Sequence, residues 1–239
     1  MHTTIDRPAP KHGWTILLVT LGLSLLITSS TQAQVQTFLN ARSPFVWDGL
    51  SAHTLMGAEE TSLAISSASI VNGLYGELQW DIKGLLGSEN NIEAKVPSFL
   101  FKYIPIQSDL DASVGHITTL SIGTRALSGI DAYAGWGTYL DGGRFALGAG
   151  LNIAWDEQQN GELSSEPEYS WIFRNHTQLS PALGVDVAAI LPTNGDRPHS
   201  DVAVVYKVLG PNFHVYVAFM DTFSNRVERR IGLSYAIGI

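Results

Sequence analysis

Apolar residues alternate one by one with small or polar residues along the final segment of the chain, 227–239. Successive side chains of a β-strand point to opposite faces, so this period of two predicts a strand with two unlike faces. One face would carry Ile231, Leu233, Tyr235, Ile237 and Ile239, and the other Arg230, Gly232, Ser234, Ala236 and Gly238. The segment therefore predicts a strand with one large apolar face.

The same alternation recurs through the second half of the chain. Between positions 143 and 156, Phe145, Leu147 and Leu151 share one face, and Gly148 and Gly150 share the other. A soluble sheet would bury the large face and put charge on its outer face. Here the face opposite the large residues is mostly Gly and Ala, which is typical of the inside of a narrow barrel with an apolar outer face. Similar strands are predicted at 184–191, 201–207 and 213–220.

The connections between these strands alternate between short and long. The short connections are 209–212, 180–182 and 141–143, and the long connections are 221–226, 192–200 and 156–168. Membrane barrels have short periplasmic turns and longer external loops. With the C-terminus on the periplasmic side, the three long connections are all predicted to be external.

The first half of the chain carries further strand patterns. Strands are predicted near 59–67, 70–84, 91–106, 115–126 and 130–140. The segment 91–106 contains two prolines, which remove ladder donors. Residues 34–58 hold either a first strand at Val35–Trp47 or a periplasmic leader. We therefore predict an all-β fold, a transmembrane antiparallel up-and-down β-barrel of about 12 strands (10 if the weakest are excluded).

The N-terminus has the order of a secretory signal peptide. Arg7 and Lys11 precede an apolar run from Trp14 to Ile27, and small polar residues lead to Ala33. The run is shorter than the roughly 20 residues that span a bilayer, which favours cleavage over an uncleaved anchor. We predict a signal peptide at 1–33 and one barrel domain at 34–239. No later apolar run is long enough for a membrane helix, and a spanning chain without helices must form a closed barrel.

These patterns resemble the bacterial outer-membrane β-barrel proteins over about 34–239, and the terminal strand is the motif that carries the resemblance. The chain departs from the usual form because it ends in Ile239 instead of phenylalanine. Its length and strand number are also similar to small outer-membrane transporters associated with aromatic-compound degradation. The resemblance implies a monomer in the cell outer membrane, contact with outer-membrane lipid and lipopolysaccharide, and recognition of the last strand by the barrel-assembly machinery.

Charged residues on the predicted inner face are the candidate functional residues. They are Arg144, Arg174, His176, Asp186, Lys207, Glu228 and Arg230. Such residues form either a selectivity region for passing solutes or a structural network of ion pairs in a narrow lumen. The four basic residues outnumber the two acidic ones in this set, so an open path would prefer anionic solutes. The formal net charge of −8 and the lack of a basic patch exclude nucleic acid as a partner.

The sequence shows no established catalytic or metal-binding motif, and we predict no cofactor. Cysteine is absent, which excludes disulfides and thiolate metal sites. None of the histidines of the mature chain is followed two residues later by the serine that barrel phospholipases and deacylases place there. The cluster at 196–201 contains His199 and Asp201 and could act as an acid–base site. The leading hypothesis is a channel for small solutes. The alternatives are a lipid- or peptide-hydrolysing barrel enzyme, or a structural or adhesive barrel.

Overall fold

The computed structural model describes most of the chain after residue 49. The described residues are 50–58, 60–67, 70, 73–83, 85, 93–94, 97–108, 113–124, 129–141, 144–158, 162–208, 213–225 and 227–237. The predicted signal peptide and the predicted strand at Val35–Trp47 lie outside these residues, and both stay predictions. In the described part of the chain, no helix has the length and apolar character needed to cross a membrane.

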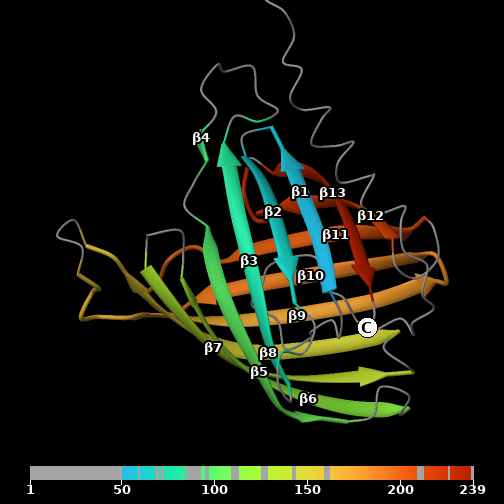
Figure 1. Cartoon of the computed structure of the whole chain (residues 1–239), viewed down its shortest axis with the longest axis horizontal. Helices are drawn as coiled ribbons and strands as arrows, with labels where there is room; N and C mark the ends of the chain where they lie inside the picture. Colours follow the sequence, from blue (N-terminus) through green and yellow to red (C-terminus); the bar gives the residue numbers. More distant parts are fainter. Residues whose placement is uncertain are drawn as a thin grey trace, which may run out of the picture.

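The described residues form one antiparallel sheet that closes on itself (Figure 1). Its strands are β1 (Leu50–Gly57), β2 (Glu60–Ser66), β3 (Leu74–Lys83), β4 (Glu93–Ala94), β5 (Ser98–Gln107), β6 (Val114–Thr124), β7 (Gly129–Leu140), β8 (Phe145–Asp156), β9 (Glu168–Ser180), β10 (Leu183–Pro192), β11 (His199–Lys207), β12 (Phe213–Met220) and β13 (Glu228–Ile237). Chain neighbours pair in order around the sheet, and β1 pairs with β13 to close it. Because β4 only extends the edge of β3, the barrel has 12 strands. The predicted up-and-down barrel is therefore confirmed.

The first half of the barrel differs in detail from the sequence prediction. The first described strand is β1, which pairs with the last strand along its whole length. The predicted strand at 91–106 is split into β4 and β5. Inside β5, the register against β6 shifts between Tyr103 and Ile106. Pro105 lies in this gap, and its missing N–H explains why the ladder is interrupted there.

The side chains of β8 point alternately inward and outward, as the sequence alternation predicts. Ala146 is fully buried and the next residue, Leu147, is 44 % exposed. Many other outward residues are large and apolar, including Phe101, Ile122 and Ile231. An exposed apolar area of this extent marks a surface that meets another apolar phase, and on a closed barrel that phase is lipid.

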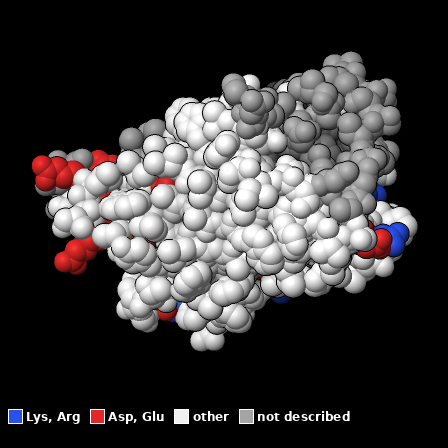
Figure 2. Space-filling model, turned by 90° about the horizontal axis from the view of Figure 1, so that it is seen from below, with Lys and Arg blue, Asp and Glu red and all other residues white. Residues whose placement is uncertain are grey.

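Most charged side chains on the face seen in Figure 2 lie at its two ends, and a few more lie along its lower edge. The broad middle of that face is free of them, and acidic groups gather at one end. Exposed acids of the connection from β8 to β9 are Asp156, Glu157, Glu162, Glu166 and Glu168. This connection and the two other long ones, β10–β11 and β12–β13, lie at the same end of the barrel, because consecutive strands alternate in direction. We call this end the loop end and the other the short-turn end.

Candidate functional site in the barrel lumen

Three of the predicted lumen residues lie together on β9 and β10. Arg174 and Asp186 are 3 % and 2 % exposed. His176 stands opposite Asp186 in the strand register, and its Nδ1 contacts the Asp186 carboxylate. These side chains face inward because each follows the inward parity of its strand. The register thus brings two of the predicted lumen residues into direct contact on the inner wall.

Lys207 lies at the short-turn end of β11. It stands opposite His214 of β12 in the register. His214 was absent from the predicted set, although its alternation with Phe213 and Val215 already put it on the inner face. A basic group and two histidines, His176 and His214, therefore lie near one another at this end of the lumen.

A second cluster of charged residues lies at the loop end, where β1 and β13 close the barrel. We call this junction the seam. Arg230 donates from Nε and Nη2 to the two carboxylate oxygens of Glu228, at 3.0 and 2.8 Å. The same guanidinium lies 3.8 Å from the Glu60 carboxylate. This bidentate geometry is the stronger form of an arginine–carboxylate pair. Because Glu60 is on β2 and the other two residues are on β13, the cluster connects the two ends of the closed sheet across β1.

Arg144 is placed differently from the prediction. It precedes β8 in the turn after β7, and its side chain is 64 % exposed. Its guanidinium lies 3.1 Å from the Asp141 carboxylate, also in the turn. The strand begins at Phe145, after Arg144, so Arg144 lies at the short-turn rim and not on the inner wall.

Lys102 is another lumen residue that sequence reasoning missed. It lies on β5, is 8 % exposed, and has the outward residues Phe101 and Tyr103 on either side. The sequence analysis considered only the prolines of this segment and gave its lysine no role. The lone lysine between large apolar residues could have indicated an inward position, because a lysine is buried only where polar groups surround it.

Lys102 approaches Arg174 across the interior of the barrel. The two residues lie on β5 and β9, which are separated around the wall by β6, β7 and β8. At about 4.8 Å per strand, the path along the wall is about 19 Å. Their charges nevertheless interact, and Lys102 also interacts with Glu77 of β3 and with His53 of β1. We call Lys102, Arg174 and Glu77 the lumen triad. It gathers charge from separate parts of the inner wall, because β3 and β5 are neighbours and β9 lies four strands from β5.

The wall around the lumen triad is polar. Ser66 Oγ donates to the Glu77 carboxylate at 3.0 Å, and Ser62 Oγ donates to Asp81 at 2.7 Å. Tyr133 and Asn152 stand opposite each other in the register and are 3 % and 2 % exposed. Among the described residues, Tyr133 Oη and Asn152 Oδ1 have no hydrogen-bond partner. Such buried polar atoms are typically satisfied by water or by a bound molecule.

Inward tyrosines lie along the wall. Tyr216 extends over Gly232 of the neighbouring strand, and its hydroxyl donates to the Thr54 carbonyl of β1 at 2.9 Å. Tyr139 extends over Gly115 in the same way, with its hydroxyl bonded to the Ser108 carbonyl at 2.6 Å. The glycines make room for the rings, which join strands that are not direct neighbours.

The inner wall carries more acids than the prediction counted. The described inward acids that are not exposed are Glu60, Glu77, Asp81, Asp131, Asp186, Asp201 and Glu228, and the corresponding inward bases are Lys102, Arg174, Lys207 and Arg230. The basic excess that the sequence suggested is therefore absent from the lumen as a whole. Any preference among ions must come from the local arrangement of charges, above all at the lumen triad.

The predicted acid–base cluster at the loop end is assembled in part. His199 Nε2 lies 2.7 Å from Asp201 Oδ1, and His199 Nδ1 lies 3.6 Å from Asp221 Oδ1. Asp201 also accepts a hydrogen bond from the Asp221 backbone N–H at 2.9 Å. The start of β11 and the connection from β12 to β13 are thereby joined to each other at the loop end. Over the described ranges, no group of three or more His, Cys, Asp or Glu side chains could hold a metal ion.

Comparisons with known proteins identify the fold. No protein-family model matches the chain, and no curated protein matches it either. Among solved structures, the KdgM porin is similar at a TM-score of 0.52 and 10% identity, over 79% of this chain and 99% of that chain. The NanC porin is similar at a TM-score of 0.51 and 9% identity, over 80% of this chain and 100% of that chain. A KdgM porin in complex with disordered oligogalacturonate is similar at a TM-score of 0.51 and 12% identity, over 79% of this chain and 99% of that chain. At these identities, the likeness establishes the outer-membrane porin fold.

Proposed function

We propose that this chain, which has the fold of the small outer-membrane porins, is a channel for small anionic solutes. The observation that carries the proposal is that Lys102 and Arg174 are both buried on the inner wall, and that their charges interact although their strands are four apart around the barrel. Two cations close to one place in the lumen both attract an anion that passes there. At an effective dielectric constant of about 20, an ion pair 4 Å apart gains about 4 kcal/mol, before screening by salt.

Glu77 gives the lumen triad its balance. Its carboxylate interacts with Lys102 and would weaken the attraction for anions without abolishing it. A moderate attraction suits conduction, because a solute must leave the site as well as enter it. The solved complex of the KdgM porin with oligogalacturonate supports an anionic solute for this fold. The polar atoms of Tyr133 and Asn152 would contact the solute or its water.

Reversal potentials in planar bilayers test the proposal. The purified wild-type barrel should conduct and should prefer anions under a salt gradient. Lys102→Gln and Arg174→Gln should each lower the anion-to-cation permeability ratio several-fold, and Glu77→Gln should raise it. Arg144→Gln is the matched control. It removes the same charge from the exposed turn and should leave the ratio within about 1.5-fold of wild type.

One result would refute the channel, and another would refute the role of the lumen triad in its selectivity. A folded barrel that gives no conductance in any variant has no open path for ions. A permeability ratio that changes equally in Arg144→Gln and Arg174→Gln would show that overall charge, and not the lumen triad, sets selectivity.

A second function is favoured by the His199–Asp201 contact at the loop end. A histidine held by a buried carboxylate is an arrangement that general-base hydrolysis uses. A lipid- or peptide-cleaving activity of the wild type that is lost in a folded His199→Gln variant would support this function. Unchanged cleavage in that variant would exclude these residues from catalysis.

A further inference from the structure

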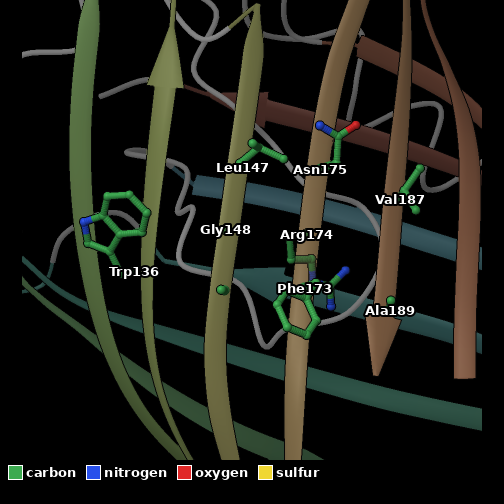
Figure 3. Close-up of a pocket in the computed structure, with 9 residues that line it drawn as sticks. Trp136, Leu147, Gly148, Phe173, Arg174, Asn175, Val187 and Ala189 are labelled. Carbon is green, nitrogen blue, oxygen red and sulfur yellow. The ribbon is translucent and has the colours of Figure 1, made fainter. Parts of the chain in front are cut away.

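An open hollow lies on the outward face of the sheet, over β7 to β10 (Figure 3). Its volume is about 290 Å³. Trp136 and Phe173 stand on either side of β8 at this hollow. Both are outward residues, 49 % and 44 % exposed. The hollow therefore belongs to the surface that meets lipid and is separate from the lumen.

The hollow arises from alternation of large and small residues around the barrel. Trp136, Ala149, Phe173 and Ala189 stand next to one another in the registers of four adjacent strands. The two aromatic residues are two strands apart, so their backbones are about 10 Å apart, with only a methyl group between them. The result is a slot between two rings, with Ala149 as its floor. A single alkyl chain has the width for such a slot.

Polar residues border the slot on the side of the short-turn end. His116, Thr138, Leu147 and Asn175 form the next register row, and Thr177 follows on β9. Asn175 Nδ2 donates to the Ala146 carbonyl at 3.3 Å, and Asn175 Oδ1 accepts from Thr177 Oγ1 at 3.1 Å. An asparagine amide can donate two hydrogen bonds, and the contact with Ala146 uses one of them. A polar amide on a lipid-facing surface calls for a functional reason.

We propose that this slot is a binding site for one glycerophospholipid. One acyl chain lies between Trp136 and Phe173 over Ala149, and the remaining Asn175 N–H donates to an ester or headgroup oxygen. A hollow of about 290 Å³ holds about ten groups of the size of a water molecule, whose share of liquid volume is about 30 Å³. A methylene group is of similar size, so the hollow accommodates most of one acyl chain.

The position of the polar row determines the leaflet. The headgroup lies toward the short-turn end, which is the periplasmic end in the orientation predicted from the sequence. The ligand is then a phospholipid of the inner leaflet and not lipopolysaccharide. His116, which stacks on Trp136 with 5.5 Å between ring centroids, lies in the same row and adds a second donor near the headgroup. The site needs a lipid-embedded barrel, but it is independent of solute passage.

Native mass spectrometry of the purified barrel tests the site, with phosphatidylethanolamine as the added probe lipid. Wild type should keep one phospholipid per barrel after detergent exchange. Ala149→Trp fills the slot and should lower the retained fraction at least tenfold. Ala132→Trp is the matched control, because it adds the same side chain to the outward face of β7 away from the slot, and should retain the lipid.

A further variant separates the headgroup contact from the chain contact. Asn175→Leu should lower retention several-fold and leave the slot open. Heat-modifiable gel migration verifies that each variant is a folded barrel. Equal retention in Ala149→Trp and Ala132→Trp, no retained lipid in wild type, retained lipopolysaccharide in place of phospholipid, or a dimer that excludes lipid would each overturn the proposal.

Discussion

Gly232 holds open the space that the Tyr216 ring fills, so Gly232→Ala should destabilise the barrel. A Cβ atom at position 232 would lie 2.0 Å from Tyr216 Cζ, which is far inside van der Waals contact. The ring must move, and Tyr216 is only 1 % exposed, so little room exists for it. Overpacking of this kind costs about 1–3 kcal/mol. Loss of the Tyr216 hydrogen bond to the Thr54 carbonyl adds about 1 kcal/mol. We expect a total loss of about 2–4 kcal/mol.

Urea unfolding in lipid vesicles, followed by tryptophan fluorescence, measures this loss. Tyr216→Phe keeps the ring and removes only the hydroxyl, so it should cost about 1 kcal/mol. Gly76→Ala serves as the steric control, because its added Cβ would lie 3.4 Å from the nearest atom, in ordinary contact. Its effect should stay within about 0.5 kcal/mol.

A double-mutant cycle decides whether the clash is the cause. In a Tyr216→Ala background, Gly232→Ala has no ring to displace and should cost less than about 0.5 kcal/mol. An undiminished cost in that background would refute the reasoning, because the penalty would then come from the strand backbone. The same result would remove the explanation for the other close tyrosine–glycine contacts, such as Tyr139 with Gly115.

Two further predictions concern the outer face and the seam of the barrel. Leu151→Arg should destabilise the barrel by about 2–4 kcal/mol if Leu151 lies near the bilayer midplane. Leu163→Arg, in an exposed loop, is the control and should cost less than about 0.5 kcal/mol. Equal losses of unfolding free energy in urea would contradict the assigned lipid face. Arg230→Gln should lower the free energy of unfolding by about 1–3 kcal/mol, because it leaves the carboxylates of Glu60 and Glu228 close together without their cation. Adding Glu228→Gln should recover part of this loss. No recovery in the same assay would argue against coupling between Arg230 and Glu228.

The alternation of residues was sufficient to predict the fold class and the facing of most side chains. The pattern around Leu147 and Gly148 predicted an apolar outer face and a small-residue inner face, and the structure confirms both. The lengths of the connections predicted correctly which of them share an end of the barrel. These properties are local, since a period of two and a turn depend only on residues near one another in the chain.

Only the tertiary structure decided which charges meet. Arg144 fell on the inner parity in the sequence, but the strand begins after it and leaves it in the turn. Lys102 was not among the predicted lumen residues, although closure of the barrel brings it near enough to Arg174, four strands away, for their charges to interact. The slot between Trp136 and Phe173 likewise depends on how three strands are staggered. The sequence alone determines which side chains of a strand share a face. The register between strands and the distance across the lumen depend on closure of the whole sheet.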